Sequence, residues 1–153
     1  MQKKTFSLIL LFVIYVILFF DLMAFKYFFY WRFWWYDIVM HFTGGLWIAL
    51  LGYYLFFFAG FAGLGRKIIK SDSVFWVTFV FVLTIGILWE LFELIATSFD
   101  LPLNYFFDTG LDLIMDMLGW ALIYYFFLRK IVIQTKSKII TEKLFPTEHK
   151  KIT

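Results

Sequence analysis

Ionisable residues recur at helical spacing in three segments of the chain that are otherwise strongly apolar. Asp37 and His41 are four residues apart, and Glu90 and Glu93 are three apart. In the third segment, aspartates stand at positions 108, 112 and 116. Spacings of three and four place side chains on one face of a helix. Carboxylates with an imidazole can bind Mg²⁺, Mn²⁺, Fe²⁺ or Zn²⁺, and such a cation can polarise a phosphoryl or acyl oxygen.

The number of acids makes charge compensation the central question. An acidic residue at the centre of a bilayer costs about 2.5–3.5 kcal/mol on insertion scales. Buried charges must be paired, bind a metal, or be neutralised by protons. Only Lys26, Arg32 and a protonated His41 are available as positive partners for six carboxylates: Asp37, Glu90, Glu93, Asp108, Asp112 and Asp116. The sequence therefore predicts a site that holds either a divalent cation or several protons.

Depth along the predicted helices assigns provisional roles within this site. We expect His41, Glu93 and Asp112 at similar depth and as ligands, with Glu90 and Asp116 as further ligands or as a catalytic base. Asp37 is expected to hold the imidazole in its tautomer, and Asp108 and Thr109 are expected to support the ligands from nearby. Close helix packing, which small residues permit, is expected at Gly44, Gly45, Gly86 and Gly119.

Composition defines the elements that must position these residues. The chain has 153 residues, of which 63% are hydrophobic, 25% are aromatic and only 16% are charged. Soluble domains have about 45–50% apolar and about 25% charged residues, so this is an integral membrane protein. Spanning helices of about 20 residues are predicted at 5–25, 37–62, 74–98 and 108–128. The chain has no cysteine, which excludes disulfides and thiolate ligands.

The basic residues predict the orientation of this four-helix domain, residues 1–128. All but two of the 14 Lys and Arg residues lie before the first helix, between the second and third helices, or in a polar tail at 129–153. The positive-inside rule therefore places both termini in the cytoplasm. The aromatic segment at 26–36 is expected at the outer membrane interface, so the acidic site faces outward. The bilayer is the expected partner, and nothing in the charge pattern suggests nucleic acid.

Three fragments together resemble a known family: YDIVMHFTGG (36–45), GILWELFELI (86–95) and DTGLDLIMDMLGW (108–120). They resemble the YjdF-like bacterial inner-membrane proteins and the wider VanZ-like superfamily. The resemblance covers about residues 36–127 and implies the same membrane architecture and the same polar positions. Asp116 stands where VanZ-like proteins often have Asn, and this extra acid favours a cation site. VanZ-type proteins are associated with low-level teicoplanin resistance, while the resemblance to YjdF-like proteins implies no particular reaction.

Three functional hypotheses remain open from the sequence. In the first, a divalent cation serves chemistry on an outward-facing, lipid-linked or phosphorylated substrate, although no nucleophile–base pair stands out. In the second, the acids carry protons or cations through a binding or transport protein, for which so small a chain would need to form a homo-oligomer. In the third, the acids form a hydrogen-bonded structural network in a non-catalytic membrane or antibiotic-resistance factor.

Overall fold

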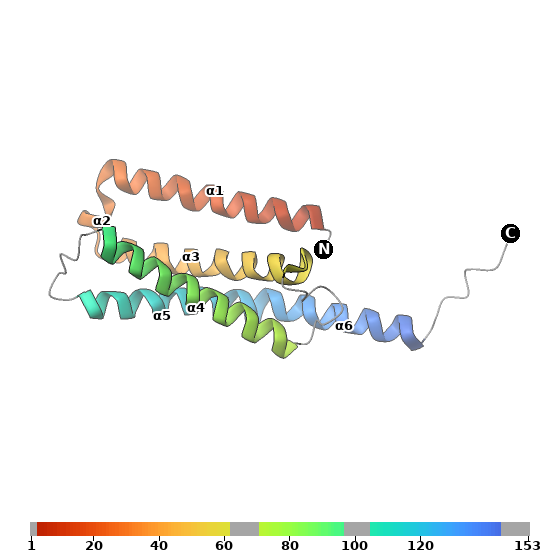
Figure 1. Cartoon of the computed structure of the whole chain (residues 1–153). Helices are drawn as coiled ribbons and strands as arrows, with labels where there is room; N and C mark the ends of the chain where they lie inside the picture. Colours follow the sequence, from red (N-terminus) through yellow and green to blue (C-terminus); the bar gives the residue numbers. More distant parts are fainter. Residues whose placement is uncertain (1–2, 62–70, 97–104, 145–153) are drawn as a thin grey trace.

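The computed structural model describes residues 3–61, 71–96 and 105–144, and the described ranges contain helices and no strand. Four long helices alternate in direction, so that the start of the first and the end of the last lie at the same end of the bundle (Figure 1). The helical elements are α1 (Lys3–Tyr27), α2 (Phe29–Arg32), α3 (Trp35–Tyr53) with a π-helical turn η1 (Tyr54–Phe58), α4 (Ser71–Ala96), α5 (Tyr105–Ile123) with a second π-helical turn η4 (Tyr124–Leu128), and α6 (Arg129–Leu144).

Four helical segments are long and apolar enough to cross a membrane, which confirms the predicted four-helix membrane bundle. They are Lys4–Tyr27, Trp35–Phe58, Ser73–Ala96 and Tyr105–Lys138. Large apolar side chains such as Phe12, Trp76 and Phe126 point outward, as expected for helices surrounded by lipid. The predicted cytoplasmic location of the termini stays a prediction.

The ends of two helices differ from the sequence-based boundaries. The last spanning helix begins at Tyr105 and continues through η4 and α6 to Leu144, whereas the sequence-based prediction ends it at Leu128. Residues 121–144 contain neither glycine nor proline, so the change to a polar sequence marks no break in the helix. The second predicted helix extends to 62, but η1 ends at Phe58 and Gly60 has a φ of 78°. This left-handed conformation, which glycine adopts readily, stops the helix.

Several predicted features fall on residues outside the described ranges. They are the basic turn containing Arg66, Lys67 and Lys70, the end of the third predicted helix at 97–98, the loop before residue 105, and the tail beyond 144.

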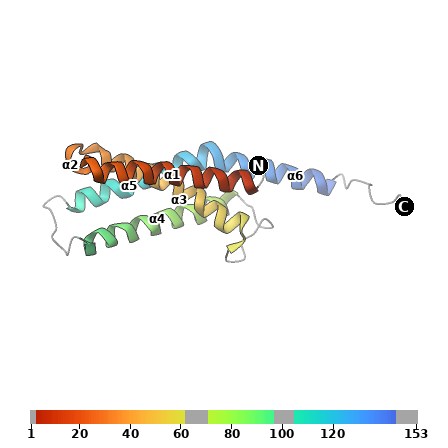
Figure 2. The same ribbon diagram turned by 90° about the horizontal axis from the view of Figure 1, so that it is seen from above.

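The bundle consists of one layer of three helices with the fourth packed on its face. Helix α3 lies between α1 and α5, and α4 crosses one side of α3 and α5 (Figures 1 and 2). Side-chain donors tie α1 to α3: Trp47 Nε1 donates to the Leu10 carbonyl at 3.0 Å, and Tyr36 Oη donates to the Phe20 carbonyl at 2.9 Å. These bonds fix α1 along its length although most of its surface is exposed.

The apolar core occupies the end of the bundle where α1 begins and η4 leads into α6. Phe6, Tyr53, Phe57 and Leu128 are almost fully buried there. Further along, Trp120 donates from Nε1 to Thr78 Oγ1 at 2.9 Å and lies edge-on to the Phe75 ring, with centroids 4.9 Å apart. The ionisable residues lie beyond this core, toward the opposite end, where α2 and the start of α5 are found (Figure 1).

Candidate functional site

The site depends on an unusually close approach of α3 to α5. A Cβ atom added at Gly45 would overlap the Asp116 carbonyl oxygen and lie 2.6 Å from Asp116 Cα. One added at Gly119 would overlap the Phe42 carbonyl oxygen and lie 2.8 Å from the Leu46 nitrogen. Backbone therefore contacts backbone at both glycines, as small residues permit in membrane helices. This contact brings the turn of α3 that precedes Gly45 against the turn of α5 that precedes Gly119.

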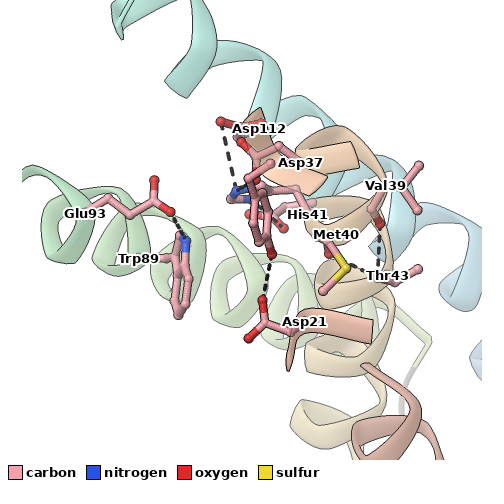
Figure 3. Close-up of polar contacts among 11 residues, drawn as sticks. Asp21, Asp37, Val39, Met40, His41, Thr43, Trp89, Glu93 and Asp112 are labelled. Atoms are coloured by element: carbon pink, nitrogen blue, oxygen red, sulfur yellow. Dashed lines mark hydrogen bonds and ion pairs between the residues drawn. The ribbon is translucent and has the colours of Figure 1, made fainter. Parts of the chain in front are cut away.

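His41 projects from α3 between Asp37 and Asp112 (Figure 3), and Asp116 is the third aspartate beside its ring. Its Nε2 atom lies 3.8 Å from Asp37 Oδ1 and 3.9 Å from Asp112 Oδ2. Its Nδ1 atom lies 3.6 Å from Asp116 Oδ1. His41, Asp112 and Asp116 are 8%, 3% and 4% exposed, respectively. The Asp37 side chain, at 37% exposed, gives the cluster contact with its surroundings.

The two nitrogen atoms of the imidazole ring have different surroundings, and each suits a different role. One ligand atom each from Asp37, His41 and Asp112 lies within 4.8 Å of the other two, which is a spacing compatible with a shared metal ion. On the opposite side, Asp116 Oδ1 is placed to accept a hydrogen bond from the Nδ1–H group. A metal-binding histidine commonly donates its other ring N–H to a carboxylate, which fixes its orientation and tautomer. The arrangement can therefore present Nε2 to a cation.

Helix α4 adds a second polar region beside this cluster. Glu90 is 6% exposed, and a Cβ added one turn earlier, at Gly86, would lie 2.7 Å from Asp116 Oδ2. Tyr105 Oη donates to the Glu90 carbonyl at 3.4 Å, so the same turn of α4 also contacts the start of α5. Within the described ranges, Glu90 Oε1 and Thr109 Oγ1 are buried without a hydrogen-bond partner.

Two of the acids expected in the site are not among the residues that converge on His41, although both are close enough to interact electrostatically with Asp37. Glu93 Oε1 accepts a hydrogen bond from Trp89 Nε1 at 2.8 Å, and Figure 3 shows this pair apart from the His41 cluster. Asp108 is exposed, and Gly44 has no atom within 4 Å of an added Cβ. The group of ligand atoms close enough for a shared ion contains Asp37 and not Glu93, and Asp116 lies beside the other imidazole nitrogen, Nδ1. The spacing of four residues between Asp37 and His41 already indicated that these two side chains lie on one face of the helix.

One interaction near the site was not foreseen from sequence. Tyr30 of α2 donates from Oη to Asp21 Oδ1 at 2.7 Å, which ties α2 to the end of α1. Burial, together with this hydrogen bond and the nearby charges of Asp21 and Asp37, raises the pKa of the Tyr30 phenol above its usual range. The hydroxyl therefore stays protonated and keeps donating. The link holds the segment that leads into α3 and its Asp37.

Fold and site together define a polytopic membrane protein of four helices with a buried histidine–aspartate cluster at one end. The chain belongs to the family described as "Predicted membrane protein (DUF2238)", whose sequence model matches residues 1–132. This match includes every residue of the cluster and ends within α6. No curated protein and no solved structure matches the chain.

Proposed function

We propose that this protein binds a divalent cation between α3 and α5, with Asp37, His41 and Asp112 as its ligands. The observation that carries the proposal is the convergence of three potential ligand atoms, two of them from nearly fully buried residues, within 4.8 Å. Carboxylates in so dry a position need a compensating charge. A divalent ion would neutralise the negative charges of Asp37 and Asp112. Asp116 would remain free to accept a hydrogen bond from the Nδ1–H group.

The ligand chemistry narrows the choice of ion. Two carboxylate oxygens and one imidazole nitrogen suit Mg²⁺, Mn²⁺, Fe²⁺ or Zn²⁺, with the imidazole favouring the last two. Three protein ligands leave at least one coordination position for water or another ligand. The proposal concerns binding, because no described side chain forms a nucleophile–base pair. Chemistry on a lipid-linked or phosphorylated substrate remains a hypothesis that this site would serve through the ion.

We also propose an orientation of the protein in the membrane and a more specific family assignment. The distribution of Lys and Arg supports termini in the cytoplasm of a cell with this protein in its inner membrane, so that the cation site opens outward. The order of the histidine, Glu-x-x-Glu and Asp-Thr-x-x-Asp motifs supports a YjdF-like protein of the VanZ-like superfamily. Neither statement is needed for the cation site itself, which rests on the geometry of three residues.

The test is the metal content of the full chain purified in detergent without chelators, measured by elemental mass spectrometry. We expect near-stoichiometric metal in the wild type and its loss in Asp112→Asn, which removes a ligand charge without changing shape. Glu93→Gln is the matched comparison, because Glu93 accepts a hydrogen bond from Trp89 and is not one of the three proposed ligands. The proposal is refuted if wild-type protein contains no metal and binds none on titration with Mn²⁺, Zn²⁺ or Mg²⁺. Protonated acids in a structural network would then explain the cluster.

A further inference from the structure

Glu90 and Thr109 form a polar position that the fold itself leaves unsatisfied. Glu90 Oε1 and Thr109 Oγ1 are both buried, and neither has a hydrogen-bond partner in the described part of the chain. A buried polar atom without a partner costs about 1–3 kcal/mol, and a charged one costs more. Such atoms in native structures call for a specific explanation, of which a bound ligand is one. Helix α4 therefore presents an acceptor that needs a donor.

This position borders the proposed cation site. Helices α4 and α5 run in opposite directions, and Gly86 contacts Asp116 while the backbone of Glu90 contacts Tyr105. The side chain of Glu90, one turn after Gly86 on the same face, thus lies along the stretch of α5 between these contacts, which contains Thr109 and Asp112. Glu90 is also close enough to interact with Thr109, and with the charges of His41, Asp37 and Asp116, although no hydrogen bond of good geometry joins Glu90 Oε1 to Thr109 Oγ1.

We infer that Glu90 and Thr109 flank the open coordination position of the cation and select a neutral, hydrogen-donating ligand for it, such as water or an alcohol hydroxyl. This inference rests on the proposed cation site. A hydroxyl oxygen can bind the ion with its lone pair while its proton satisfies Glu90 Oε1. The threonine hydroxyl can both donate and accept, so it can complete the hydrogen bonds of the same ligand.

An anionic ligand at the open coordination position would be repelled by Glu90, whereas a neutral ligand would donate a hydrogen bond to it. The oxygen or nitrogen of the anion would bring a negative charge beside the buried Glu90 carboxylate, with no proton between them. Like charges at short range in a partly dry site repel strongly, and specificity often depends on such a repulsive element. Glu90 would then be the residue that disfavours phosphate or carboxylate oxygens as direct ligands. The substrate class favoured here is one that offers a hydroxyl.

The test uses Co²⁺ as a spectroscopic probe and azide as a small anion. Full-length protein in detergent is loaded with Co²⁺ and titrated with azide while its visible absorption is followed. We expect Glu90→Gln, which keeps the shape and removes the charge, to bind azide at least about tenfold more tightly than wild type, because the like-charge repulsion is gone. Thr109→Val keeps the Glu90 charge and loses only a hydrogen-bonding group, so any gain in its azide affinity should be clearly smaller than that of Glu90→Gln. Glu93→Gln, whose carboxylate accepts a hydrogen bond from Trp89, should match wild type.

Two results overturn the inference while leaving the cation site intact. One is equal azide affinity in wild type and Glu90→Gln. The other is a gain in Thr109→Val as large as in Glu90→Gln, which would show that packing and not charge controls access. Wild type alone gives a second measurement: neutral formamide should bind the Co²⁺ protein more tightly than isosteric formate, and the reverse order overturns the inference. Failure of wild type to bind Co²⁺ would instead refute the cation site, and this inference with it.

Discussion

Two adjacent glycines in α3 offer the sharpest test of how the fold builds the site. Gly45 faces α5, and a methyl group there would overlap backbone atoms of Asp116. Gly44 faces open space, with no atom within 4 Å of an added Cβ. The substitutions Gly45→Ala and Gly44→Ala therefore make the same chemical change one residue apart, in opposite environments.

The expected magnitudes follow from these contacts. Alanine is favoured over glycine within a helix by about 1 kcal/mol, so Gly44→Ala should be neutral or stabilise the protein by up to that amount. At Gly45 the obstacle is backbone, which cannot rotate away, and α3 and α5 must separate by about 1 Å to reach ordinary packing distances. Overpacking of this kind typically costs about 1–3 kcal/mol, which outweighs the gain in helix propensity.

The same separation should weaken the site. His41 is on α3, while Asp112 and Asp116 are on α5, so moving the helices apart lengthens contacts that are already 3.6–3.9 Å. Loss of a supporting contact around a metal ligand typically costs 10- to 100-fold, about one to two orders of magnitude, in affinity. We therefore expect Gly45→Ala to lose both stability and bound metal, and Gly44→Ala to lose neither.

The assay is unfolding of the detergent-solubilised protein with increasing sodium dodecyl sulfate, followed by tryptophan fluorescence, together with metal analysis of the same samples. A Gly45→Ala protein that unfolds at the same midpoint as Gly44→Ala and retains its metal would refute the close α3–α5 contact. A destabilised protein that keeps full metal affinity would show that the site does not depend on this helix spacing.

Three further predictions address other parts of the molecule. Asp112→Asn should lower Mn²⁺ affinity by at least about tenfold and Glu93→Gln should not, as measured by calorimetric titration; equal losses would favour the ligand set expected from depth alone. Thr78→Val should destabilise the fold by about 1–3 kcal/mol, since it leaves the buried Trp120 indole N–H without its acceptor; an unchanged unfolding midpoint would contradict this. Because the pKa of Tyr30 is raised on folding, wild-type stability should fall as pH rises above about 10, and Tyr30→Phe should show a smaller fall over the same range.

Sequence patterns identified the spanning helices and the end of the bundle that carries the acids, because both depend on local properties. Long apolar runs predict spans directly, and spacings of three and four predict shared helix faces. The residue at which a helix ends is harder to predict from sequence, as α6 shows. Hydropathy marks where the chain leaves an apolar environment, whereas a helix ends only where its backbone hydrogen bonding stops, and Lys, Gln and Ile residues after Leu128 allow it to continue.

Glu93 illustrates what depth cannot determine. A residue's height in the bilayer follows from counting along the helix, but the direction in which it points depends on how the helix is rotated against its neighbours. Gly86 sets that rotation for α4, because it contacts Asp116 and turns Glu90 inward. Glu93, three residues further on, lies on the same side of α4, but its carboxylate accepts a hydrogen bond from Trp89 of its own helix and is not among the ligand atoms that converge at His41. The sequence shows the glycine but not which helix it contacts.

The structure also divides the site between the α3–α5 pair and a third helix, α4. All three proposed ligands and the orienting Asp116 come from α3 and α5, whose glycines fix them at backbone contact. Glu90, on the other side of the open position, comes from α4. Cation retention should therefore depend on substitutions in α3 and α5, whereas substitutions in α4 should change which ligand the cation accepts. Equal loss of metal from variants in α3, α4 and α5 would contradict this division.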